Sequence, residues 1–368
     1  MRIKQKISVP LQLLLVQTGV WSFSFLFLAM LLREQGLFGW FFILGYMALA
    51  ALCVISLLLV TKYNAKWFLR MSYVLNCGMA LGFFVLPLRE AFLVYVFGWA
   101  GLVILFWLPL NMSFFQESHN GRHAKDSWSY MVAPGMLSIV IPPLGAMMMR
   151  MYGYKWLFLL TAGLYLLAMG WVWRKVPSQT WKVQRKEAIL NFKGLKTISM
   201  MEGALHFFSS VVLGVYALRF LQNETEVGWF WSYVAVVGLV AGFFMARMSD
   251  AKQERKKYVV ILFSLLLICV VGFMLAKSLG VFLVLMGAYM IMATVSSPIR
   301  LAISMDVKEK DINFWWSREL FLNIGRAVTL AVAGGLFFLE WYGLLFGMYA
   351  VMIGAYPILI FHKLKKLR

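Results

Sequence analysis

Long apolar segments alternate with short polar ones along the whole chain. Each apolar segment is about 20 residues long, the length that an α-helix needs to cross the hydrocarbon core of a membrane. The pattern predicts an all-α membrane protein without a soluble domain. The twelve expected helices cover residues 10–32, 38–61, 71–87, 91–115, 127–149, 154–173, 198–220, 227–247, 258–276, 280–303, 314–338 and 342–361.

The composition supports lipid as the solvent for most of the chain. Hydrophobic residues make up 62% of the sequence and charged residues 14%, which excludes an ordinary water-facing surface. Membrane lipids are therefore expected partners. The three cysteines, Cys53, Cys77 and Cys269, all fall within expected helices and show no C-x-x-C spacing. This pattern argues against a disulfide framework and a cysteine metal site.

Basic residues are distributed unevenly between the two sets of loops. The net charge is +20, from 35 Lys and Arg against 15 Asp and Glu. Arg326 lies deep within a span, and 28 of the other basic residues lie at the two ends of the chain or in and next to the even-numbered loops. The six in or next to the odd-numbered loops are Arg33, Arg89, Arg150, Lys155, Arg219 and Lys277. Positive loops face the cytoplasm, so we expect both termini to be cytoplasmic in a cytoplasmic (inner) membrane, and no nucleic-acid partner is needed.

A basic connection divides the chain into two similar halves. Residues 174–197 carry seven Lys or Arg. Pro109 and Glu117 recur as Pro298 and Asp306 at an offset of 189. At an offset of 190, four further residues recur: Gly135, Gly145, Tyr152 and Gly153 match Gly325, Gly335, Tyr342 and Gly343.

Matched prolines and glycines are informative because each marks a kink or a close helix contact. The repeat predicts an N-terminal six-helix bundle over residues 1–175, a cytoplasmic linker over 176–197 and a C-terminal six-helix bundle over 198–368. Duplicated bundles of this kind place a binding site between the halves near the membrane midplane. The alternative is that these residues are simply common in membrane helices.

Several motifs resemble those of the major facilitator superfamily. Residues 61–66, TKYNAK, keep the basic residues of the family loop G-x-L-x-D-R-x-G-R-R but lack its acid. The equivalent loop at residues 246–250, ARMSD, keeps Asp250, to which the resemblance assigns a gating role. Residues 141–146, IPPLGA, replace the family's G-P-x-x-G-G, and this departure argues against a family antiporter.

The resemblance extends over the whole chain. Residues 107–111 and 318–326 resemble runs in uncharacterised bacterial members of the superfamily. It implies two pseudo-symmetric six-helix bundles, with helices 1, 4, 7 and 10 lining a central cavity. The residues that it places in a substrate pocket are Gln17, Trp21, Asn111, His206 and Ser297. Each of them could instead hold neighbouring helices together through hydrogen bonds.

The eleventh expected helix carries a row of polar residues. Glu319, Asn323 and Arg326 are spaced i, i+4, i+7 and therefore share one face. Arg326 lies roughly 18 Å from the start of the helix at a rise of 1.5 Å per residue. A charge at this depth is costly and must face protein or water. We expect these three residues to form a gate, with Glu319 neutralising Arg318 or Arg326, or Arg326 to bind a polar or anionic substrate directly.

Glu202 and His206 lie one turn apart in the seventh expected helix. A carboxylate in apolar surroundings beside an imidazole suits proton transfer. We expect this pair to couple transport to protons. The alternative is an interfacial acid that bonds the neighbouring loop.

One cluster outside these helices could suggest metal or catalytic chemistry. Glu117, His119, His123 and Asp126 lie close together in sequence, but Gly121 interrupts the helix that a zinc-binding H-x-x-x-H pair needs. No cofactor or metal is expected. The sequence also lacks a Gly-rich phosphate loop and a G-x-S-x-G motif, so we expect a gradient to supply the energy.

The sequence thus predicts a secondary transporter, not an enzyme, that moves a small solute by alternating access, with protons as a candidate coupling ion. The many aromatic and Met residues give a slight preference for efflux of lipophilic compounds. A membrane enzyme acting on a lipid-linked substrate, built on the Glu117 cluster, is one alternative. A receptor or assembly partner that does not transport is the other.

Overall fold

The computed structural model describes residues 8–37, 39–115, 130, 133–176, 178–252, 255–307 and 311–365. Its N-terminal elements are α1 (Val9–Ser24), η1 (Phe25–Phe27), α2 (Leu28–Glu34), α3 (Gly39–Leu59), β1 (Lys62–Asn64), α4 (Ala65–Val85), α5 (Leu88–Leu102), η2 (Val103–Trp107), α6 (Leu108–Phe115), η3 (Ala133–Met136), α8 (Leu137–Tyr152) and α9 (Tyr154–Lys175). Its C-terminal elements are β2 (Thr180–Lys182), α10 (Arg185–Asn191), α11 (Lys196–Phe207), η4 (Phe208–Val212), α12 (Leu213–Ala217), α13 (Glu224–Lys252), α14 (Arg255–Leu275), α15 (Leu279–Val307), α16 (Ile312–Phe338) and α17 (Tyr342–Lys365).

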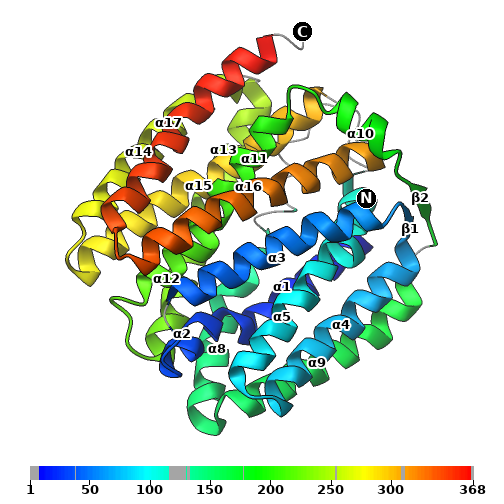
Figure 1. Cartoon of the computed structure of the whole chain (residues 1–368), viewed down its shortest axis with the longest axis vertical. Coiled ribbons are helices and arrows are strands. Elements are labelled where there is room, and N and C mark those ends of the chain that lie inside the picture. Colours follow the sequence, from blue (N-terminus) through cyan, green and yellow to red (C-terminus); the bar gives the residue numbers. More distant parts are fainter. Residues whose placement is uncertain are drawn as a thin grey trace, which may run out of the picture.

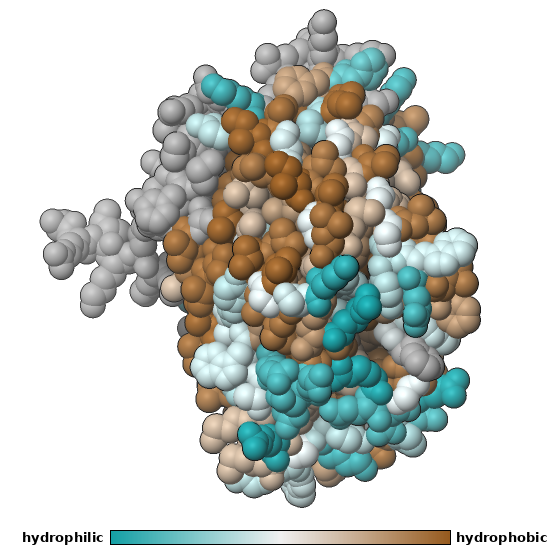
Figure 2. Space-filling view, turned by 90° about the vertical axis from the view of Figure 1, so that its left-hand side faces the viewer, coloured by the Kyte–Doolittle hydropathy of each residue, from teal (hydrophilic) through white to brown (hydrophobic). Residues whose placement is uncertain are grey.

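The helices have the length and surface of membrane spans. Within the described residues, ten helical segments are long and apolar enough to cross a membrane. Large apolar side chains cover their outer faces, and Leu59, Leu167 and Val284 are each more than 70% exposed. Figure 2 shows a mostly hydrophobic face with hydrophilic residues gathered in its lower part. The chain is therefore a multi-pass membrane protein.

The helices begin and end close to the expected positions, with two differences of note. The helix expected at 71–87 begins at Ala65, because the Asn64 side chain accepts a hydrogen bond from the Trp67 backbone N–H at 3.0 Å and so caps the helix. Of the helix expected at 127–149, the described helical part begins at Leu137 after the η3 turn.

The helices of the two halves meet along α3 and α16, which run side by side through the middle of the molecule (Figure 1). Helices α4, α5 and α9 lie on one side of this pair, and α14, α15 and α17 lie on the other (Figure 1). A second contact between the halves joins α8 to α13.

Three of the spans are interrupted near their middle. A 3₁₀ turn, η1, separates α1 from α2, and π-turns interrupt the helix at η2 and η4. A π-turn inserts an extra residue into the helix and leaves local backbone groups less regularly bonded, which is why such turns are frequent at functional sites. Residues of η2 and η4 line the cavities described below.

The linker expected at 176–197 folds against the rest of the chain. Its strand β2 pairs antiparallel with β1, with Lys62 opposite Lys182, and it continues into α10, which packs on α16. The Gln184 backbone N–H also donates to Asn313 Oδ1 at 3.0 Å. Both α10 and the strand pair lie at the end of the molecule where α1 begins and α17 ends (Figure 1).

Glycines allow helices α11 and α16 to approach each other closely. A Cβ at Gly203 of α11 would collide with the backbone carbonyl of Leu322, and one at Gly325 of α16 would collide with that of Met200. The sequence-matched pairs do not share such contacts: Gly145 lies against the Phe23 carbonyl, whereas Gly335 has open space among the described residues. Gly145 and Gly335 therefore match in sequence but do not make the same kind of helix contact.

Candidate functional site

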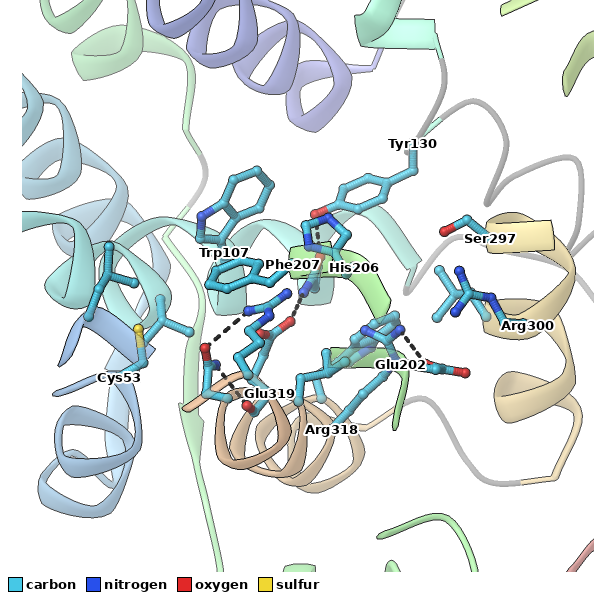
Figure 3. Close-up of a pocket in the computed structure, with 18 of the residues that line it drawn as sticks. Cys53, Trp107, Tyr130, Glu202, His206, Phe207, Ser297, Arg300, Arg318 and Glu319 are labelled. Carbon is cyan, nitrogen blue, oxygen red and sulfur yellow. Dashed lines mark hydrogen bonds and ion pairs between the residues drawn. The ribbon is translucent and has the colours of Figure 1, made fainter. Parts of the chain in front are cut away.

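A cavity of about 210 Å³ lies between the helices of the two halves. Helices α3, α5 and α6 and the π-turn η2 line it from the N-terminal half, and α11, α15 and α16 line it from the C-terminal half. Figure 3 shows its side chains converging from these elements. The charged residues on its wall are Glu202, Arg300, Arg318, Glu319 and Arg326.

Glu202 of α11 is bonded on both of its carboxylate oxygens. Arg318 Nη2 of α16 lies 3.0 Å from Glu202 Oε2, and the Tyr356 hydroxyl of α17 donates to Glu202 Oε1 at 2.8 Å. The Arg318 and Glu202 side chains are 11% and 4% exposed. The buried ion pair joins α11 to α16 (Figure 3), and the Tyr356 hydrogen bond adds α17 to this cluster.

A second polar chain crosses from the N-terminal to the C-terminal half. The Asn111 Nδ2 group of α6 donates to Glu319 Oε1 of α16 at 3.4 Å. The Tyr130 hydroxyl donates to Asn111 Oδ1. Asn111 and Glu319, expected in a pocket and a gate respectively, are thus in direct contact.

Arg326 is held by uncharged groups. Its Nη1 donates to Asn323 Oδ1 at 3.0 Å, and Asn323 Nδ2 donates in turn to the Glu319 backbone carbonyl at 2.8 Å. The guanidinium carbon lies 4.6 Å from the ring centre of Phe207. We expected Glu319 as the partner of Arg326, but among the described residues its hydrogen-bond partner is Asn323.

His206 faces open space inside the bundle. Its side chain is exposed although it lies in mid-helix, and it lines two cavities, so its exposed surface faces them. Its backbone carbonyl accepts hydrogen bonds from the Ser209 and Ser210 hydroxyls at 2.8 and 2.9 Å. No hydrogen bond joins it to Glu202 among the described residues, although the two side chains are one turn apart.

A second cavity of about 260 Å³ adjoins the first. His206, Ser297 and Arg300 line both cavities. The two cavities therefore meet at these residues, and Ser297 lies where the resemblance placed it, on the cavity wall.

Two of the expected pocket residues lie elsewhere. Gln17 is buried and exchanges two 3.2 Å hydrogen bonds with Asn76, an arrangement that ties α1 to α4. Trp21 lines a separate cavity of about 30 Å³, and its ring centre lies 5.8 Å from that of Trp99, which lines the main cavity.

Other expectations fall outside the described side chains. Asp250 lies in α13, but its side chain is not described. Glu117, His119, His123 and Asp126 lie outside the described residues. Among the residues that the structure does describe, no group of three or more His, Cys, Asp and Glu is placed to hold a metal ion.

The sequence did not assign Arg300, Tyr130 or Tyr356 to the site. Arg300 lines both cavities, with its guanidinium 5.7 Å from the ring centres of Phe263 and Tyr356. Its position one turn after Ser297 was the signal, because residues at i and i+3 share a helix face. Tyr130 and Tyr356 gave no comparable signal.

Comparison with known families agrees with the motifs. Residues 129–310 match the family model described as Major Facilitator Superfamily. No curated protein matches the chain. The family match and the ten apolar helices together support a membrane transporter.

Proposed function

Taking the chain as a major facilitator superfamily protein, we propose that it is a secondary transporter that moves a small solute across the cytoplasmic membrane by alternating access. The observation that carries the proposal is the polar cavity between the N-terminal and C-terminal helices, enclosed in an otherwise apolar bundle. Charged groups are costly at this depth, and a water-filled binding site is the usual reason for them.

Contacts between the halves close the bundle at one end through Arg33. Arg33 at the end of α2 donates to the backbone carbonyls of Leu218, Leu221 and Gln222, at 2.6, 2.8 and 3.1 Å. These carbonyls follow the C-terminus of α12, where a cation is favourable. Water molecules can replace these hydrogen bonds to Arg33 and to the three carbonyls when the two halves separate.

A different set of contacts closes the opposite end. The Trp316 indole N–H of α16 donates to the Leu57 carbonyl of α3 at 3.0 Å, and the Phe115 and Trp315 rings stack with centres 4.8 Å apart. Leu57 lies at the far end of α3 from Gly39, whose Cβ would meet Val215 of α12. Two separate sets of contacts support a mechanism in which one end opens while the other stays closed.

Glu202 is the candidate proton carrier. Protonation of its carboxylate would remove the charge that holds Arg318 at 3.0 Å and would free that guanidinium toward the cavity. A proton taken up at Glu202 would therefore change both the charge and the shape of the site. His206 lies on the same wall, with its imidazole facing the cavity, and completes the proposed coupling pair.

We further propose two six-helix bundles, residues 1–175 and 198–368, as the moving units, with both termini cytoplasmic. The linker between them pairs with β1 and packs on α16, so it contacts both units. Glu319, Asn323, Arg326 and Asp250 are the proposed gating residues.

Flux in proteoliposomes tests this function. Vesicles containing the purified chain are incubated with a defined mixture of small anions, cations and neutral solutes, with and without a pH gradient. The solutes that enter the vesicles are then measured by mass spectrometry. We expect at least one solute to move faster than in empty vesicles. Movement of none, in protein that remains folded, would contradict the proposal.

A matched pair of variants tests the coupling. Glu202→Gln removes the buried carboxylate, and we expect it to abolish the effect of the pH gradient while solute exchange continues. Glu90→Gln is the control, because Glu90 is an exposed acid at the start of α5 and lines neither cavity. An unchanged response to the gradient in Glu202→Gln would rule out Glu202 as the carrier.

A further inference from the structure

Positive charge exceeds negative charge on the wall of the main cavity. The described lining residues include three guanidinium groups, Arg300, Arg318 and Arg326, and two carboxylates, Glu202 and Glu319. Glu202 is bonded to Arg318, and Glu319 to the neutral Asn111 amide. With both acids ionised, the wall retains one positive charge in surroundings where an unbalanced charge is costly.

Arg326 has hydrogen-bonding capacity to spare. Its Nη1 is engaged with Asn323, whereas its Nε is buried without a hydrogen-bond partner among the described residues. The Nε and Nη groups of a guanidinium form a planar fork that fits a carboxylate or phosphate with two parallel hydrogen bonds. The resting partners of Arg326 are a neutral amide and a ring, which an anion can displace or join.

Arg300 offers a second such donor on the wall of the same cavity. Its Nε is also buried without a partner among the described residues, and its guanidinium lies near the rings of Phe263 and Tyr356. Arg300 lines both cavities, so an anion that moves from one to the other stays close to a guanidinium.

Aromatic side chains also line this cavity, and the Phe207 ring lies against Arg326. Trp99, Trp107, Phe207 and Trp315 line the same cavity. Flat aromatic surfaces bind apolar groups and leave the charged end of a ligand to the guanidinium. A small inorganic anion would leave these surfaces in contact with water.

We propose that the solute is a small organic anion with an aromatic or aliphatic body, and that Arg326 binds its anionic group. The proposal rests on the transport function above and names the class of its substrate. The anion supplies the charge that the cavity lacks, and its body fills the aromatic part of the wall.

Three probes with one ring and different charge test the proposal: benzoate, benzylammonium and benzyl alcohol. Cys53 reports occupancy, because it lines the main cavity whereas Cys77 and Cys269 do not. In a chain carrying Cys77→Ser and Cys269→Ser, the rate of Cys53 alkylation is measured with and without each probe, and uptake of the labelled probes into proteoliposomes is measured in parallel. We expect benzoate to slow alkylation and to be taken up, and benzylammonium to do neither.

Variants assign the effect to Arg326. Arg326→Gln should weaken protection by benzoate about 10- to 100-fold, the loss of a charge-assisted bond, and Arg326→Lys should retain part of it. Arg70→Gln is the matched control, because Arg70 also lies 4.6 Å from a ring centre, that of Trp173, but does not line the cavity. It should bind benzoate normally.

The outcomes separate the two proposals. Protection or uptake of benzylammonium or benzyl alcohol equal to that of benzoate would overturn the substrate class and leave transport standing. Normal benzoate binding in Arg326→Gln would overturn the assignment of the anion site to Arg326. Absence of flux of any solute would instead contradict the transport function itself.

Discussion

The buried pair of Glu202 and Arg318 should behave as a unit in stability measurements. We consider Glu202→Gln, which removes the negative charge but keeps an oxygen that can accept from Tyr356. It leaves the Arg318 guanidinium without its ion-pair partner in a site where the two side chains are only 11% and 4% exposed. Arg318→Met instead leaves the Glu202 carboxylate without its ion-pair partner.

The size of the effect follows from the geometry. Two unit charges 3.0 Å apart attract by about 5 kcal/mol at an effective dielectric constant of about 20. Removing one partner of a buried pair typically costs about 3–5 kcal/mol, because the remaining charge keeps its desolvation penalty. Removing both partners removes both penalties, so the double variant should lose less than either single variant.

The free energy of unfolding in mixed detergent micelles, followed by tryptophan fluorescence, measures this cycle. We expect a coupling energy of at least about 2 kcal/mol between the two substitutions. Glu90→Gln serves as the surface control and should change stability by less than about 0.5 kcal/mol. Additive losses in the double variant would refute the reasoning, since they would mean that the two charges do not interact.

Two further predictions concern the contacts between helices. Gly203→Ala and Gly325→Ala should each lower the free energy of unfolding by more than about 2 kcal/mol, because the added Cβ would collide with backbone atoms that cannot move aside. Gly78→Ala is the control and should be neutral or stabilising, because open space surrounds Gly78 among the described residues. Equal losses at all three glycines in the same micelle assay would contradict this prediction. Arg33→Ala should raise the rate at which an impermeant thiol reagent reaches Cys53 from the outer side, because it removes three hydrogen bonds between the halves, and an unchanged rate would show that Arg33 does not hold that end closed.

Much of the fold was predictable from hydrophobic pattern, because the membrane leaves the backbone few alternatives to a helix. The helix at 91–115, for example, is observed as the span Leu88–Phe115, with the π-turn η2 inside it. The early start of α4 was missed because Lys66 and Arg70 look like loop residues in sequence. Asn64 nevertheless caps that turn, and Arg70 lies over the Trp173 ring.

The candidate site was predictable only where its residues share one helix. The spacing of Glu319, Asn323 and Arg326 correctly indicated one polar face, and Asn323 does contact both neighbours. The spacing of Glu202 and His206 was less informative, because neighbouring helices decide which partner a side chain meets. Glu202 is bonded to Arg318, 116 positions away, and no local pattern in the sequence indicates that pair.

The accessibility of Cys53 tests the central claim most directly. Cys53 is 3% exposed and lines the cavity between the halves, so one thiol reports on both entrances. In a chain carrying Cys77→Ser and Cys269→Ser, a membrane-impermeant thiol reagent is applied to one side of the membrane at a time. Alternating access predicts that Cys53 reacts from either side. Reaction from one side alone, or from neither while the unfolded chain reacts, would contradict the account.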